Sequence, residues 1–243
     1  MNSTIAAPTR RPFLRANWAN LAIVSYAVAP EQVHDLVPPH CTLDLRDGQA
    51  FVSLVAFDFL GTQVRGVAWP GYRNFPEINL RMYVRHGADR GVCFIREYVP
   101  QRLVARMARF FYNEPYRRAR MISQTQETPT SITIRHELIL PTSTSTLSIT
   151  GEKPAIHTDP AGIEHFFKEH EWGFGKTHRG ELLRFRVEHP TWDIWPVRSF
   201  ELHWDWAAAY GARWQFLQGK SPYSVVFARG SEVRVFPGEG IIP

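Results

Sequence analysis

The sequence predicts an α+β fold in which mainly antiparallel strands close into a barrel and a few helices lie on its periphery. Many segments of strand length are rich in β-branched and aromatic residues and are bounded by proline or glycine. Only three short segments have the 3.6-residue periodicity of a helix. No repeat or linker interrupts this pattern, so we assign residues 1–243 to one domain, with residues 1–10 as an N-terminal tail. Long, largely apolar strands in this number often close into a barrel.

The predicted strands are apolar runs or apolar–polar alternations that end at turn residues. Residues 49–61 are apolar on both faces, which predicts a central strand buried on both sides. The turn at Gly48 predicts a hairpin between that strand and residues 41–47. Further strands are expected at residues 20–30, 77–85, 92–100, 131–140, 181–190, 199–206 and 224–236. Helices are expected at residues 30–39, 101–111 and 163–173, the last of them ending at Gly173.

The segment "EINLRMYVR" alternates strictly between polar and apolar residues. The polar face carries Glu77, Asn79, Arg81, Tyr83 and Arg85, and the other face is entirely apolar. In a barrel this polar face lies either toward the lumen or toward water, and the alternation alone does not choose between them. Burial of such groups is costly unless they pair or hold a polar ligand.

Composition and charge limit the class of protein. Apolar residues make up 44% of the chain, which is ample for a core, and the net charge is +5. The two cysteines form no disulfide or metal pattern and indicate a reducing compartment. With no apolar leader and no apolar run long enough to span a bilayer, the sequence predicts a cytoplasmic protein without a membrane partner. It does not predict an oligomeric state.

The common cofactor and catalytic motifs are absent. "GFGKT" lacks the first glycine of a phosphate loop, because position 170 is a histidine, and neither a dinucleotide motif nor a nucleophile elbow replaces it. The histidines have no zinc-site spacing, and a solvated helix face explains His165 and Glu169 better than a metal site does. We therefore predict no cofactor and no metal.

An arginine stripe follows one side of the helix expected at residues 101–111. Arg102, Arg106 and Arg109 oppose a face made by Leu103, Met107 and Phe110. We expect the stripe to be exposed and the opposite face to be core. Nucleic-acid binding usually needs a broader basic face, so it is disfavoured, although docking of a polyanion or partner stays open.

Several blocks together resemble the uncharacterised YqjF-like family, a domain of unknown function in the acetoacetate decarboxylase-like superfamily. The blocks run in order from about residue 11 to about residue 236: "RPFLRANWANLAIVSYAV", "LVPPHCTLDLRDGQAFVSLVAFDF", "RNFPEINLRMYVR", "GVCFIREYVP", "YNEPY", "EHEWGF" and "RVEHPTWDIWPV". The resemblance implies the superfamily fold, a closed β-barrel with a ligand cavity inside and helices around it.

The resemblance also implies a departure in chemistry. In the decarboxylases, a lysine that follows a proline and precedes a second cation forms a Schiff base with a β-keto acid. The matching positions here are Pro115, Tyr116 and Arg117, and tyrosine cannot form an imine. All four lysines lie after residue 150, outside such a context. Glu77 matches a glutamate that lines the decarboxylase pocket, which implies a retained cavity without a Schiff-base lysine.

Three hypotheses for function follow. The first is an enzyme acting on a small carboxylate or carbonyl compound, with Glu77 and Tyr116 as proton-transfer groups and Arg81 or Arg96 as the carboxylate anchor. Asn79 and Tyr83 would complete its binding face. The second is a binding protein that uses the same cavity without chemistry, and the third is docking through the arginine stripe. Tyr116 either packs and hydrogen-bonds only, or is shifted toward phenolate by Arg117.

Overall fold

The computed structural model describes residues 11–102 and 115–241. Strands predominate among these residues, and the helical elements are few and short. The strands are β1 (Leu14–Val28), β2 (Thr42–Leu43), β3 (Ala50–Val64), β4 (Phe75–His86), β5 (Asp89–Val99), β6 (Tyr116–Arg118), β7 (Arg120–Glu127), β8 (Ser131–Ile139), β9 (Thr144–Glu152), β10 (Trp172–Lys176), β11 (Leu182–Glu188), β12 (Val197–His203), β13 (Ser224–Val235) and β14 (Glu239–Ile241). The helical elements are η1 (Pro30–Gln32), η2 (His34–Leu36), α2 (Ile163–Lys168), α3 (Trp206–Tyr210) and η3 (Ala212–Leu217).

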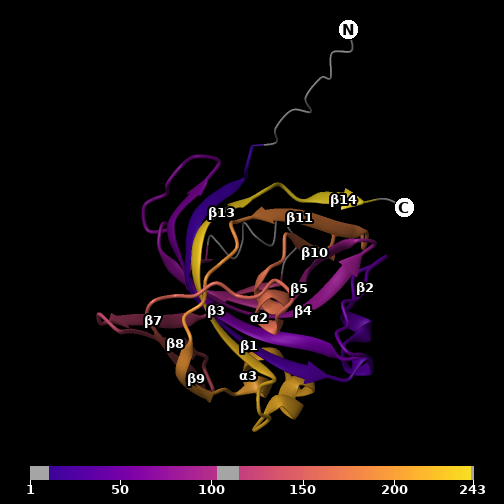
Figure 1. Ribbon diagram of the computed structural model, residues 1–243. Helices are drawn as coiled ribbons and strands as arrows, with labels where there is room; N and C mark the ends of the chain where they lie inside the picture. Colours follow the sequence, from indigo (N-terminus) through magenta and orange to yellow (C-terminus); the bar gives the residue numbers. More distant parts are fainter. Residues whose placement is uncertain (1–10, 103–114, 242–243) are drawn as a thin grey trace.

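The larger sheet is strongly curved, and its pairings return to their starting strand (Figure 1). Going round it, β4 pairs with β3, β3 with β1, β1 with β13, β13 with β11, β11 with β10, β10 with β5 and β5 again with β4. These pairings are antiparallel except for that of β10 with β5, which is parallel and two residue pairs long. The short strand β6 pairs in parallel with the C-terminal part of β5, from Glu97 to Val99.

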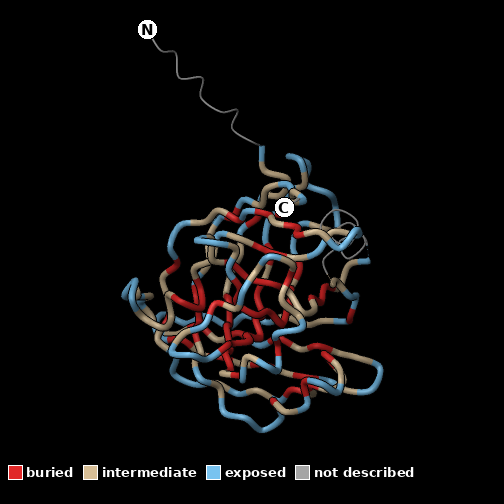
Figure 2. Tube along the Cα trace, turned by 90° about the vertical axis from the view of Figure 1, so that its right-hand side faces the viewer, coloured by how far each residue is buried: buried red, intermediate tan, exposed pale blue. Residues whose placement is uncertain are grey.

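A second sheet of four strands, in the order β12-β9-β8-β7, lies beside the first. Two apolar clusters therefore flank β1, β3 and β4. One cluster takes the even-numbered residues of β3 from Ala50 to Ala56, of β4 from Ile78 to Val84 and of β1 from Ala22 to Val28, and it includes apolar residues of β8, β9 and α3. Odd-numbered residues of β3 and the two phenylalanines of α2 belong to the other. Figure 2 shows the buried residues concentrated inside the fold.

Burial on both faces explains the apolar strand β3 and settles the orientation of β4. Ile78, Leu80 and Met82 are fully buried on one side of β4. On the other side Glu77 and Asn79 are also buried. The polar face of "EINLRMYVR" thus points to the interior, which was the less ordinary of the two orientations left open by its alternation.

Several predicted elements differ from the structure. The turn at Gly48 forms and closes one antiparallel bridge, between Arg46 and Gln49, but the expected hairpin goes no further, since β2 pairs with β4 instead of β3. The helix expected at residues 30–39 consists of two short 3₁₀ turns, η1 and η2. The helix expected at residues 163–173 ends at Lys168, because the chain then extends to form β10 beside β5 and β11. The helix expected at residues 101–111 lies outside the described residues from residue 103 onward, so Arg106, Arg109 and Met107 are not placed.

In the part of the chain that the structure describes, none of the helices has the length and apolar character needed to cross a membrane.

Candidate functional site

A pocket of about 420 Å³ lies on the side of β3 and β4 that their odd-numbered residues face. Its wall is largely aromatic and aliphatic and includes Phe57, Phe59 and Phe75. A small set of polar side chains interrupts this wall. Mostly apolar pockets of this size with a few placed polar groups are the usual form of small-molecule sites.

Glu77 is the centre of the polar set, and only 3% of its surface is exposed. Asn79 Nδ2 donates a hydrogen bond to Glu77 Oε1 at 3.0 Å. The Tyr116 hydroxyl donates to Glu77 Oε2 at 2.9 Å. The strand alternation places Glu77 and Asn79 on one face, and the parallel pairing of β6 with β5 brings Tyr116 to them from 39 residues away.

Glu97 completes this cluster, and sequence reasoning did not select it. It lies opposite Asn79 in the β4–β5 ladder and opposite Tyr116 in the β5–β6 ladder. Its carboxyl group acts on the pKa of both Glu77 and Tyr116, which places it beside them. Since two carboxylates repel and neither can donate, a Glu77–Glu97 hydrogen bond requires a proton on one of them. A glutamate in the otherwise apolar segment "VCFIREYVP" was the available signal.

Burial sets the protonation of this cluster. Desolvation raises the pKa of Glu77 from the ordinary 4.5 to about 7, against opposing hydrogen bonds from Asn79, Tyr116 and Glu97 and the charge of Arg81. Desolvation also raises the pKa of Tyr116 well above 10.0, and the negative charges of Glu77 and Glu97 act in the same direction. The expectation that Arg117 shifts Tyr116 toward phenolate is wrong in direction. Arg117 is exposed, and Tyr116 is a neutral hydrogen-bond donor at physiological pH.

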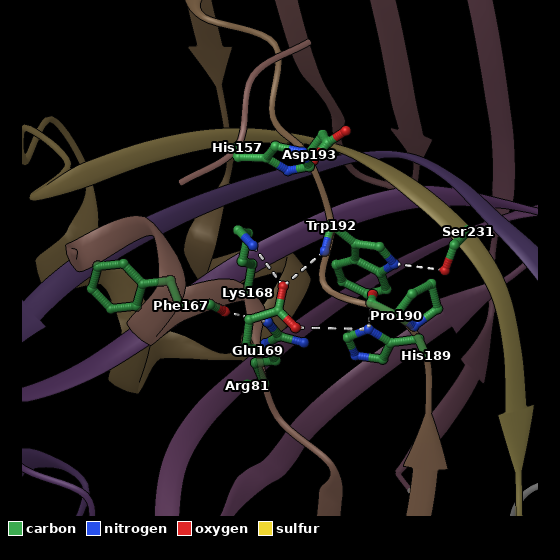
Figure 3. Close-up of polar contacts among 10 residues, drawn as sticks. All are labelled: Arg81, His157, Phe167, Lys168, Glu169, His189, Pro190, Trp192, Asp193 and Ser231. Atoms are coloured by element: carbon green, nitrogen blue, oxygen red, sulfur yellow. Dashed lines mark hydrogen bonds and ion pairs between the residues drawn. The ribbon is translucent and has the colours of Figure 1, made fainter. Parts of the chain in front are cut away.

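Cationic and imidazole groups form the other polar part of the pocket (Figure 3). Lys168 has no exposed side-chain surface, and its Nζ donates to Glu169 Oε1 at 2.6 Å. The same carboxylate accepts the backbone N–H of Trp192 and faces His189. Arg81 Nη2 donates to the carbonyl oxygen of Phe167, the residue before Lys168, so β4 and α2 meet here.

The imidazoles of this group are neutral. Burial lowers the pKa of His170 well below 6.5, and the cations Arg81 and Arg90 act in the same direction. Burial likewise lowers the pKa of His189, whose ring stacks on Trp192 with centroids 3.9 Å apart. His165 and Glu169 were interpreted as a solvated helix face. For Glu169 this is wrong, because only 14% of its side chain is exposed and it pairs with the buried Lys168, a residue that sequence reasoning did not select.

Two of the other predicted site residues lie elsewhere. Tyr83 is buried behind the pocket lining, and its hydroxyl is hydrogen-bonded to Ser53. Arg96 points away from the pocket and donates to the carbonyl oxygen of Ala209. Glu77, Asn79, Arg81 and Tyr116 all line the pocket. Within residues 11–102 and 115–241, no three His, Cys, Asp or Glu side chains are grouped as metal ligands would be.

Comparison with known proteins places the chain in a family. A profile of the DUF2071 family, described as an uncharacterized conserved protein, matches residues 15–232. The chain belongs to the DUF2071 family. This DUF2071 protein is 32% identical over 121 residues to the uncharacterized protein YqjF of Bacillus subtilis (strain 168). The aligned segment is 49% of the present chain and 50% of YqjF, so it spans about half of that relative.

Solved structures show the fold of the DUF2071 chain in other proteins. Acetoacetate decarboxylase from Legionella pneumophila subsp. pneumophila str. Philadelphia 1 matches with a TM-score of 0.68 at 14% identity, over 100% of this chain and 92% of that one. The enduracididine biosynthesis enzyme MppR complexed with pyruvate matches with a TM-score of 0.66 at 15% identity, over 97% and 93%. At such identities the likeness establishes an acetoacetate decarboxylase-like fold and nothing about activity.

Proposed function

We propose that this chain is an enzyme that transfers protons on a small carboxylate or carbonyl compound, inside a closed barrel formed by the ring of paired strands. The observation that carries the proposal is the buried Glu77, whose pKa is raised to about 7 and which is hydrogen-bonded to Tyr116 and lies beside Glu97. A carboxyl group with a pKa near the working pH exchanges protons readily in both directions.

The groups around Glu77 suit proton abstraction next to a carbonyl. Ionised Glu77 would accept a proton from the carbon beside the carbonyl and later return it. The Tyr116 hydroxyl would donate a hydrogen bond to the enolate oxygen as its charge develops. Asn79 holds the Glu77 carboxyl in position, and Glu97 shares the proton of the cluster. Arg81 would hold a substrate carboxylate. The pyruvate bound in MppR, a protein of the same fold, belongs to the proposed class of compound.

Exchange of the methyl protons of pyruvate in D₂O, followed by ¹H NMR, tests the reaction directly. We expect the wild-type protein to accelerate exchange, the Glu77→Gln variant to lose about 100-fold, and Tyr116→Phe to lose about tenfold, because removal of a general base commonly costs about 10²–10⁴ in rate. Glu201→Gln, on an exposed part of β12, is the matched control and should exchange like wild type. Wild-type binding of pyruvate without exchange, or full exchange by Glu77→Gln, would contradict the proposal.

The proposed chemistry does not use an imine. Tyr116 stands where the resemblance places the Schiff-base lysine, and the lysine that lines the pocket, Lys168, is in an ion pair with Glu169. A protonated amine lacks the lone pair needed for attack on a carbonyl. After incubation with acetoacetate or pyruvate and borohydride, we expect the intact mass of the protein to be unchanged. A stoichiometric reduced adduct on Lys168 would overturn this part of the proposal.

A further inference from the structure

The pocket changes in character along β4. Its lining residues on this strand are, in order, Phe75, Glu77, Asn79 and Arg81. Alternate residues of a strand are spaced by about 6.6 Å, so Phe75 and Arg81 mark regions about 20 Å apart at their Cα atoms. Glu77 lies between an aromatic end and a cationic end. The order of side chains on one strand therefore defines an axis along the pocket.

The aromatic end adjoins the surface. Trp69 lies in the connection between β3 and β4, lines the pocket and has 53% of its surface exposed. Phe59 and Phe75 stack with centroids 4.7 Å apart just inside it. Trp18 on β1 extends this wall, with its ring centroid 5.0 Å from Phe57 and 6.1 Å from that of Trp192. An acid of two or three carbons would leave this large apolar surface in contact with water.

The cationic end is short of negative charge. Arg81 and Lys168 both line it, and Glu169 is the carboxylate that contacts Lys168. Among the described residues no carboxylate contacts the Arg81 guanidinium, its Nε has no hydrogen-bond partner, and its Nη2 donates to the neutral carbonyl of Phe167. Both ring nitrogens of His170 likewise lack a partner within these residues. Buried cations and donors of this kind are costly unless a ligand completes them.

We propose that the ligand is an amphipathic carboxylate, with its carboxylate between Arg81 and Lys168 and an aryl group against Trp18, Phe59 and Phe75. This inference rests on the proposed function, because it puts the carbon beside the carbonyl next to Glu77 and Tyr116. Lys168 serves as a charged anchor, so the lysine has a binding role in place of a covalent one. The substrate class narrows from small keto acids in general to keto acids that carry a bulky apolar group.

Binding of three compounds to the wild-type protein, measured by calorimetry at one pH, tests both ends of the axis. The compounds are pyruvate, 4-phenyl-2-oxobutanoate and the uncharged 4-phenyl-2-oxobutanamide. We expect the phenyl acid to bind at least tenfold more tightly than pyruvate, through burial of its ring. We expect the amide to bind at least tenfold more weakly than the acid, through loss of charge-assisted hydrogen bonds. Equal affinities for the two acids, or for acid and amide, would overturn the inference.

Variants test which residues form the cationic end of the pocket. Lys168→Met should reduce the preference for acid over amide about tenfold, and Arg81→Met should do the same. Lys176→Met, an exposed lysine on β10, is the matched control and should keep the full preference. Because Lys168→Met leaves Glu169 without its cation, the double variant Lys168→Met/Glu169→Gln is measured beside it. An unchanged acid preference in the folded variants would contradict the anchor role.

The two proposals fail separately. If pyruvate exchange depends on Glu77 but 4-phenyl-2-oxobutanoate binds no better than pyruvate, the ligand class is wrong and the proton-transfer function stands. If the phenyl acid shows the expected preferences but no compound exchanges protons, the pocket geometry stands and the proposed function is wrong.

Discussion

Replacing Glu77 with glutamine is expected to remove a large part of the pH dependence of the protein's stability. The pKa of Glu77 is about 7 in the folded chain, against an ordinary 4.5 when unfolded. Between these values the folded state holds the proton more tightly than the unfolded state. Protonated Glu77 therefore contributes stability that is fully present below pH 4.5 and is lost as the pH rises through 7. At about 1.4 kcal/mol per pKa unit, the loss amounts to roughly 3 kcal/mol.

Urea unfolding at pH values from 5 to 8 measures this effect. The difference in unfolding free energy between wild type and Glu77→Gln should change by roughly 3 kcal/mol across the range, with the variant gaining relative to wild type as the pH rises. Glu201→Gln should follow the wild-type curve, because this glutamate is exposed. Parallel curves for wild type and Glu77→Gln would show that the proton of the buried cluster does not belong to Glu77.

Replacing Gly230 with alanine is expected to destabilise the fold by about 2–5 kcal/mol. Gly230 has φ +79°, and an added Cβ would lie 1.9 Å from the carbonyl oxygen of Trp18 on the neighbouring strand. A left-handed backbone costs a non-glycine residue about 1–2 kcal/mol. Overpacking against a backbone that cannot yield adds about 1–3 kcal/mol. Gly230 pairs with Ala19 in the β1–β13 ladder, next to the register shift of β1 against β3 that follows Ala19. Trp18, the preceding residue, lines the pocket.

Gly219→Ala separates the two causes. Gly219 also has a positive φ, +72°, but no atom lies within 4 Å of its added Cβ. Thermal and urea unfolding should therefore show a loss of only about 1–2 kcal/mol for this variant. If Gly230→Ala costs no more than Gly219→Ala, the strands can separate at Trp18, and the close approach does not constrain the pocket wall.

Local pattern was sufficient to predict β4 and β5, which carry Glu77, Asn79 and Glu97, but not the short strand β6 that carries Tyr116. The alternation in "EINLRMYVR" placed Glu77, Asn79 and Arg81 on one face, and the family resemblance brought Tyr116 to the same site. Which side of the sheet this face takes could not be predicted, because alternation specifies only that the two faces differ. The answer depended on the second sheet, whose strands cover the opposite face.

The missed residues depend on long-range pairing. Glu97 becomes part of the cluster through the register of β5 with both β4 and β6, which no local rule supplies. Glu169 and the adjacent His170 were interpreted as part of a solvated helix face, and Lys168 was not selected as a site residue. The expected helix ends early because Trp172 and Gly173 pair with Gly91 and Val92 of the distant strand β5, and this pairing turns α2 into the interior. The pattern within one strand predicts which side chains share a face, whereas the strands that pair with it decide which faces meet.

The two-sided division of β3 and β4 has a consequence for how new specificities can arise. Odd positions from Val55 to Phe59 and from Phe75 to Asn79 touch the pocket, while Ala56 and Ile78 on the opposite face belong to the cluster shared with the second sheet. Substitutions at odd positions can therefore reshape the ligand site without altering the contacts that join the sheets. A combinatorial library confined to Val55, Phe57, Phe59 and Phe75, with Glu77 kept, would vary the shape of the pocket on one unchanged framework.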